Sequence, residues 1–120
     1  MLKLTSSQYH AFSRGALTRF IDRLSERLPE QWPGESKRLG PERVRSAAET
    51  AVKQAMELGF RTELDVARFV HLAFAFRSMR FHEQPWAEAI MRDPGLQPRV
   101  RMNRLFEAGI AALRAAEMTR

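Results

Sequence analysis

Three histidines and a close pair of acids are the side chains of this chain that could do chemistry. His10, His71 and His82 are far apart in the sequence, and none has a second ligand at the spacing of a metal site. Glu63 and Asp65 could act as paired carboxylates, but two positions apart on a helix they point in different directions. Electrostatics at a helix start explains both acids. The sequence therefore predicts no metal site and no acid–base pair.

The sequence also lacks the motifs of nucleophilic catalysis and phosphate binding. Its seven serines are not in the strand-to-helix context of a nucleophile elbow. Residues 34–40 are not followed by the lysine and hydroxyl residue of a phosphate-binding loop. The chain contains no cysteine, so it has no thiolate. We therefore expect a protein that is not an enzyme and that binds no cofactor.

Helices are the elements that must position any site in this chain. Apolar side chains recur at helical spacing, and no segment shows the alternation and β-branched enrichment of a strand. Pro29 is expected to end the first helix, which starts at Thr5 or Ser6. The predicted helices cover residues 5–28, 41–58, 62–78 and 98–116, with a short helix at residues 85–92.

The boundary between the second and third helices is the best-defined one. Gly59 can adopt the left-handed conformation that ends a helix, and Thr62 can cap the next helix through its hydroxyl. Apolar side chains then cover more than half of the circumference of residues 62–78, as expected of a buried helix. We therefore predict an all-α fold, a single compact bundle of four main helices and one short helix, with the helix at about residues 62–78 in the centre.

The length of the chain indicates one domain over residues 1–120. A cluster of proline and glycine residues indicates a linker at about residues 29–41. No apolar run approaches the roughly 20 residues that span a membrane. The N-terminus lacks the apolar region of a signal peptide. These features predict a cytoplasmic protein that does not bind membranes.

The net charge of +6 could attract nucleic acid or an acidic protein partner. Acidic residues are interspersed among the basic ones, which is not the separated basic footprint of a nucleic-acid-binding protein. Residues 55–59 have the spacing of a DNA-binding helix-turn-helix, but the helix that follows is too apolar to enter a DNA groove. Nucleic-acid binding is therefore supported by the net charge alone.

Aromatic and arginine side chains indicate a protein-binding surface. Loop aromatics can anchor a partner or fold back over a core, and the sequence leaves both open, with Trp32 expected to be the more exposed. Arginine beside aromatics suits an interface, especially with an acidic partner. The candidate interface residues are Trp32, Arg77, Arg80, Phe81, Trp86, Arg92, Arg101 and Arg104.

Residues 59–70, 74–76 and 85–94 carry a resemblance to a known group of proteins. They contain Gly-x-x-Thr-Glu, then Val-x-x-Phe-Val, and later Pro-Trp-Ala. With residues 8–12 and 20–28 they resemble small helical proteins encoded in bacterial type VI secretion clusters, beside PAAR spike-tip proteins, toxic effectors and effector chaperones. The resemblance implies an accessory role in loading a toxin onto the spike, and it carries no catalytic residues.

The function that we expect is a non-enzymatic adaptor or co-chaperone. Its partner would be a type VI secretion effector, the effector's chaperone or a spike component. One alternative is an immunity protein that neutralises a cognate toxin, and another is a nucleic-acid-binding helical protein. The sequence leaves the partner and the oligomeric state open, including a homo-oligomer.

Overall fold

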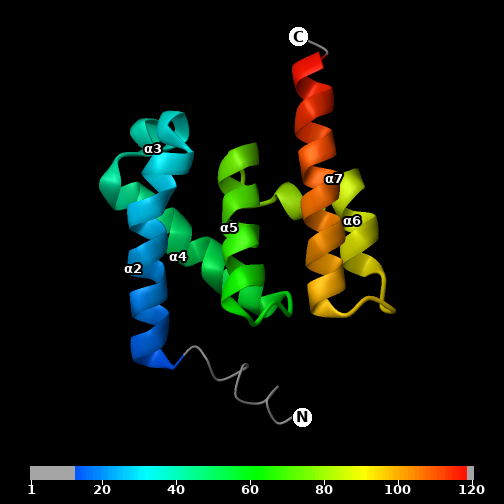
Figure 1. Cartoon of the computed structure of the whole chain (residues 1–120), viewed down its shortest axis with the longest axis horizontal. Helices are drawn as coiled ribbons and strands as arrows, with labels where there is room; N and C mark the ends of the chain where they lie inside the picture. Colours follow the sequence, from blue (N-terminus) through cyan, green and yellow to red (C-terminus); the bar gives the residue numbers. More distant parts are fainter. Residues whose placement is uncertain (1–12, 119–120) are drawn as a thin grey trace.

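The chain folds into successive helices joined by short connections (Figure 1). The computed structural model describes residues 13–118, and over that range the chain has no strand. The predicted all-α class is therefore confirmed. The elements are α2 (Arg14–Gln31), α3 (Pro33–Leu39), α4 (Pro41–Glu57), α5 (Glu63–Phe76), the 3-10 helix η1 (Phe81–Glu83), α6 (Pro85–Arg92) and α7 (Pro98–Met118).

The boundary between α4 and α5 lies where the sequence predicts it. Gly59 has a φ of 101°, and the Phe60 N–H donates to the Ala55 carbonyl at 3.0 Å, which closes α4. The Thr62 hydroxyl accepts the Asp65 N–H at 3.2 Å and caps the first turn of α5. Both predicted boundary residues, Gly59 and Thr62, are confirmed.

The first long helix differs from the prediction at both ends. Ser13 is extended and caps α2 by accepting the Ala16 N–H at 3.3 Å, so α2 begins only at Arg14. The predicted start at residues 5–6 lies outside the described residues. The prediction that Pro29 ends the helix is wrong, because α2 continues to Gln31.

Packing explains why Pro29 is tolerated inside α2. A proline removes a single helical N–H, so α2 loses one backbone hydrogen bond at Pro29. Leu28 is fully buried, and Trp32 packs against the core just beyond the helix end. These contacts with distant residues hold the last turn of α2 in place.

The predicted linker at residues 29–41 is mostly helical. Pro33 begins α3 and Pro41 begins α4, positions at which the missing N–H of proline is not needed. Gly40, with a φ of 84°, separates the two helices. The linker prediction is therefore wrong in its secondary structure, and the prediction of four main helices and one short helix misses α3.

Helix α4 holds α2 and α5 apart. In Figure 1, α2, α5 and α7 stand side by side, and α4 crosses behind α2 and α5. Helix α4 packs extensively against both α2 and α5, whereas α2 and α5 touch each other at few positions. Helix α7 packs against α5 and α6. This arrangement leaves a groove between α2 and α5.

The core is built from small side chains on α4 and large ones on α5 and η1. Ala48, Ala51 and Ala55 are fully buried and let α5 approach the backbone of α4 closely. The rings of Phe69 and Phe81 pack with their centroids 4.9 Å apart. Burial of such side chains is the main source of stability in a chain of this size.

Candidate protein-binding groove

The three aromatic residues predicted at an interface are folded into the protein. Phe81 is fully buried against Phe69, so it cannot anchor a partner. Trp86 is half-buried and packs against the core. Trp32 is also half-buried, and its Nε1–H donates to His71 Nδ1 at 2.9 Å. The predictions of Phe81 as an interface residue and of an exposed Trp32 are therefore corrected.

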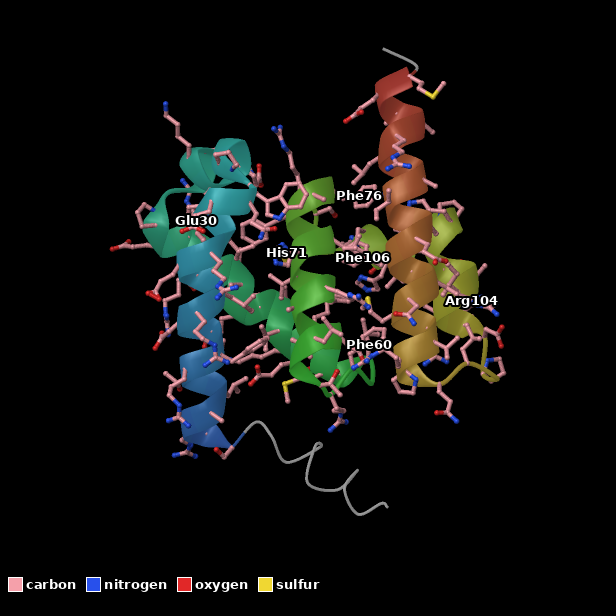
Figure 2. All side chains as sticks on the ribbon, viewed as in Figure 1. Glu30, Phe60, His71, Phe76, Arg104 and Phe106 are labelled. Atoms are coloured by element: carbon pink, nitrogen blue, oxygen red, sulfur yellow. The ribbon has the colours of Figure 1, made fainter. Side chains whose placement is uncertain are left out.

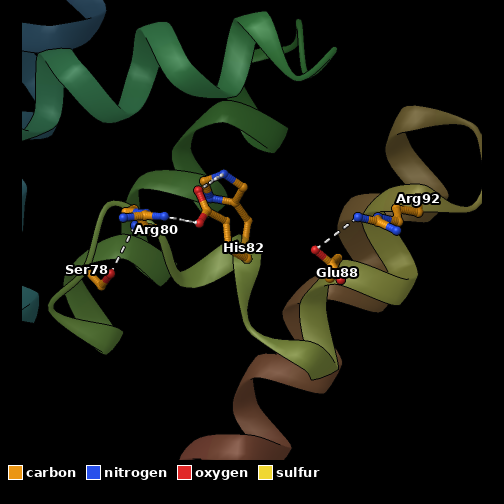
Figure 3. A network of polar contacts seen from close by, with 6 residues as sticks. Ser78, Arg80, His82, Glu88 and Arg92 are labelled. Carbon is orange, nitrogen blue, oxygen red and sulfur yellow. Dashed lines mark hydrogen bonds and ion pairs between the residues drawn. The ribbon is translucent and has the colours of Figure 1, made fainter.

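Two of the predicted arginines pair with acids on their own helical turn. Arg80 pairs with Glu83 at 2.7 Å, and Arg92 pairs with Glu88 at 3.4 Å (Figure 3). Both arginine side chains are largely in solvent, and both glutamates are about half exposed. Exposed pairs of this kind stabilise a protein by at most about 1 kcal/mol. These arginines are partly neutralised within the chain.

Of the other three predicted arginines, two lie on α7 and one follows α5. Arg101 and Arg104 are on α7, where Arg101 Nη2 donates to the Asp93 carbonyl at 2.6 Å and Arg104 is exposed. Arg77 follows the last residue of α5, and its Nε lies 3.3 Å from Glu35 Oε1. Arg77 and Arg101 therefore bond to groups of the same chain, whereas Arg104 is exposed.

Glu35 is a buried carboxylate that ties α3 to the end of α5. Arg38 donates to its Oε1 from Nε at 2.9 Å, and Arg77 Nε lies 3.3 Å from the same oxygen. The hydrogen bond from Arg38 is the main cause that lowers the pKa of Glu35, against the opposing effect of burial. The contact explains the position of α3.

The α2–α5 groove is one surface that the structure offers for a partner. It has a volume of about 320 Å³ and is open to solvent. Phe20 and Leu24 lie at its base, where both are almost fully buried. Leu64 stands on its rim with 46% of its surface exposed. The lining residues are Phe20, Arg23, Leu24, Arg27, Gln31, Glu63, Leu64, Ala67 and His71.

Positive charge borders this groove on the side of α2. Arg23 Nη2 pairs with Glu63 Oε1 at 3.2 Å and connects the two walls. Arg27 is exposed and forms no ion pair with another residue in the range 13–118. The groove therefore presents an apolar floor beside an uncompensated guanidinium.

His71 connects the groove to Trp32, one of the predicted residues. Figure 2 shows His71 on the side of α5 that faces α2. Its Nδ1 accepts the hydrogen bond from Trp32 Nε1–H, so Nε2 carries the proton in the neutral imidazole. Burial lowers the pKa of His71 below its ordinary value of 6.5. His71 is thus a neutral hydrogen-bonding group at neutral pH.

Sequence reasoning missed the groove residues, although their spacing carries a signal. Phe20, Leu24, Arg27 and Gln31 follow one face of α2, and Leu64 and His71 lie on one face of α5. Helical spacing alone does not show which of these faces another helix leaves uncovered. That depends on α4, which separates α2 from α5.

A second, larger pocket of about 900 Å³ lies on the other side of α2. Pro29, Pro33 and Pro41 line it, together with Asp22 and Arg45, which form an ion pair. The pocket's other charged residues are Glu26 and Lys37, and neither forms an ion pair with another residue of the described range 13–118. Its two acidic and two basic residues cancel, so the pocket favours neither an anionic nor a cationic ligand.

The described residues contain neither a metal-binding cluster nor a membrane-spanning helix. No group of three or more His, Cys, Asp or Glu side chains gathers within residues 13–118. None of the helices in that range is both long enough and apolar enough to cross a bilayer. In comparisons with known proteins, no family model, no curated protein and no solved structure matches this chain.

Proposed function

We propose that this protein is a non-enzymatic adaptor that binds an acidic amphipathic helix of another protein in the α2–α5 groove. The observation that carries the proposal is the groove itself. It combines a buried apolar floor, the exposed Leu64 on its rim and the unpaired Arg27. A groove with these properties fits the helix-in-groove mode of recognition.

The shape of the groove supports a helical partner. Two helices form its walls, and its lining on α2 runs from Phe20 to Gln31. Eleven residues of helix rise about 16 Å, or three turns. An apolar side chain on a partner helix would contact the exposed Leu64 and the adjoining Ala67, in the same way that ridges of packed helices fill grooves.

The charge of the groove supports an acidic partner. Arg27 is free to pair with a carboxylate, and the chain as a whole carries a net charge of +6. An acidic helix would be attracted over a distance and oriented when it arrives. Arginine also pairs with carboxylates in a bidentate geometry that fixes orientation.

The class of partner that we propose rests on the resemblance to type VI secretion accessory proteins. It is a secretion effector, its chaperone or a spike component, and the adaptor would act while the effector is loaded. An immunity protein would need to block a toxin, and no residue described here favours that role over an adaptor. The apolar groove floor favours a protein over nucleic acid as the ligand.

Calorimetric titration of the full chain against the neighbouring effector and effector chaperone tests this proposal. We expect one of them to bind the wild-type protein. Arg27→Glu reverses the free charge, and Leu64→Asp places a carboxylate on the apolar rim. Each should weaken binding by about tenfold, which corresponds to about 1.4 kcal/mol.

Arg43→Glu is the matched control, because Arg43 is exposed on α4 outside the groove. It makes the same change in net charge as Arg27→Glu and should leave the affinity almost unchanged. Circular dichroism of all variants checks that they are folded. The proposal fails if neither protein binds the wild type, or if Arg27→Glu and Leu64→Asp bind as tightly as Arg43→Glu does.

A further inference from the structure

A small pocket lies between α3, α4 and the end of α5, away from the α2–α5 groove. Its volume of about 240 Å³ is below the roughly 300–1,000 Å³ of most small-molecule sites, so it suits a compact ligand. Half-buried apolar side chains from α3, from α4 and from the segment after α5 form part of its wall. The lining residues of this α3–α5 pocket that bear on binding are Glu35, Arg38, Leu39, Ala47, Arg77 and Met79.

The charges of the α3–α5 pocket are out of balance. Among residues 13–118, its charged lining residues are Arg38, Arg77 and Glu35, two positive groups and one negative group. Arg38 Nε and Arg77 Nε lie 2.9 and 3.3 Å from the same oxygen, Glu35 Oε1. Neither arginine forms an ion pair with a second acid in the described range. One positive charge therefore has no carboxylate to balance it.

Both arginines keep hydrogen-bond donors that the described chain does not use. Arg38 contacts Glu35 through Nε and Nη2, and Arg77 does so through Nε. Arg38 Nη1 and the two terminal nitrogens of Arg77 have no bonding partner among residues 13–118. The two side chains are 55% and 65% exposed, so a ligand can reach them from solvent. A guanidinium presents such donors in a planar fork that matches a carboxylate.

The backbone holds Arg77 at the edge of this pocket in an uncommon conformation. Its φ of 54° lies in the left-handed region, where a residue with a Cβ is strained. Strained residues of this kind are concentrated at ligand clamps and switch regions. The conformation starts the Arg77 side chain beside Glu35, so both guanidiniums gather at one mouth of the pocket.

We propose that the α3–α5 pocket binds a small organic monocarboxylate, with its carboxylate on Arg38 and Arg77 and its apolar body against Leu39 and Met79. One negative charge on the ligand matches the one unbalanced positive charge of the site. The apolar wall favours a ligand with a hydrocarbon body over inorganic phosphate, which has none. The pocket shares no lining residue with the α2–α5 groove, so this site is separate from the proposed helix-binding function.

Nuclear magnetic resonance titration of the full chain with three probes tests the proposal. Benzoate has the charge and the apolar body, benzamide has the body without the charge, and acetate has the charge with almost no body. Benzoate should shift the amide signals of residues 35–39 and 77–79 with a dissociation constant of about 1 mM or lower. Benzamide and acetate should each bind at least about tenfold more weakly.

Substitutions with opposite effects separate ligand binding from a purely structural role. Arg77→Gln and Arg38→Gln each remove a positive charge, so each should weaken benzoate binding at least about tenfold. Glu35→Gln removes the competing carboxylate and keeps an acceptor for Arg38, so it should tighten binding about tenfold. Arg43→Gln is the matched control, because Arg43 is exposed on α4 outside the pocket.

Circular dichroism checks that each variant is folded, and two arginine variants keep the test open if one of them is not. The proposal is overturned if benzoate gives no saturable shift in the pocket residues, or if benzamide or acetate binds as tightly as benzoate. It is also overturned if Glu35→Gln weakens benzoate binding as the arginine variants do, or if the folded arginine variants bind benzoate like Arg43→Gln.

Discussion

Arg77 has the least ordinary backbone conformation in the described part of the chain. Its φ of 54° is the only positive φ outside glycine in residues 13–118. It ends α5 as Gly59 ends α4, with the Ser78 N–H donating to the Ala73 carbonyl at 3.0 Å. A residue with a Cβ costs about 1 kcal/mol more than glycine in this region. The ion pair with Glu35 is what an arginine adds here.

We therefore expect Arg77→Gly to be more stable than Arg77→Ala by about 1 kcal/mol, because both lose the ion pair and only alanine keeps the conformational cost. Chemical denaturation of the two variants measures the difference. Gly59→Ala is the control, since a Cβ at Gly59 would meet no atom within 4 Å and its cost is conformational alone. Equal stability of Arg77→Gly and Arg77→Ala would contradict this reading.

His71 makes the stability of the protein depend on pH. Because burial lowers the pKa of His71 in the folded state, the unfolded chain binds a proton more readily. The contribution of His71 is full above about pH 6.5 and is lost as the pH falls below that value. Protonation at Nδ1 would also break the hydrogen bond from Trp32.

We expect the free energy of unfolding to fall when the pH is lowered from about 7.5 to about 5.5. His71→Gln keeps an acceptor for Trp32 Nε1–H and does not titrate, so it should lose less stability over that interval. His82, whose pKa is also lowered mainly by burial, remains in both proteins and accounts for a shared decrease. An identical decrease in both proteins would show that His71 plays no part.

At the scale of the elements, a buried carboxylate joins the start of α5 to the start of α7. Asp65 is 2% exposed, and Arg99 Nε lies 2.7 Å from its Oδ1. Arg99 also donates to the Thr62 hydroxyl at 3.2 Å, so the helix cap belongs to the same network. The two helix starts are thus held together by charge-assisted hydrogen bonds.

Arg99→Ala should therefore destabilise the protein by about 2 kcal/mol, because it leaves the buried Asp65 carboxylate with a hydrogen bond unmade. Arg23→Ala is the matched comparison, since it breaks the exposed pair with Glu63 and should cost about 0.5 kcal/mol. Urea denaturation of both variants measures the two values. The role of this network is refuted if Arg99→Ala costs no more than Arg23→Ala.

Close packing at Gly109 sets the distance between α7 and α5. A Cβ there would lie 2.7 Å from Leu72 Cδ2 and 3.4 Å from the Trp86 ring. Overpacking costs about 2 kcal/mol and outweighs a gain of about 1 kcal/mol in helix propensity, so Gly109→Ala should destabilise by about 1 kcal/mol.

Gly34→Ala is the comparison, because it should raise the stability that Gly109→Ala lowers. Gly34 lies in α3, and an added Cβ would meet no atom within 4 Å. We expect it to stabilise the protein by about 0.5 kcal/mol through helix propensity alone. Thermal denaturation compares the two variants, and a Gly109→Ala protein as stable as Gly34→Ala would mean that α7 moves freely to make room.

Helix boundaries could be predicted where their cause is local. Gly59, Thr62 and Pro85 act on the backbone within a few residues, and α4, α5 and α6 begin or end beside them. Pro29 is different, because its place inside α2 depends on Leu28 and Trp32 packing against distant elements. Propensity favoured an end at Pro29, and tertiary contacts outweighed it.

At the scale of the whole molecule, the site was harder to predict than the fold. Of the eight predicted interface residues only Trp32 contacts the groove lining, through His71. Phe81 is in the core because it packs with Phe69, twelve positions away. The groove exists because α4 separates α2 from α5. Which aromatic is covered and which helix face is left open are outcomes of long-range packing, and no short motif encodes them.

Hydrogen exchange of the full chain, with and without the bound effector or effector chaperone, tests the central claim most directly. We expect amides in residues 20–31 and 63–71 to exchange more slowly when the partner is bound, because the helices that form the groove open less often. Slower exchange that is confined to residues 33–45 beside the proline pocket or to α7, or no change in residues 20–31 and 63–71, would contradict the assignment of the groove.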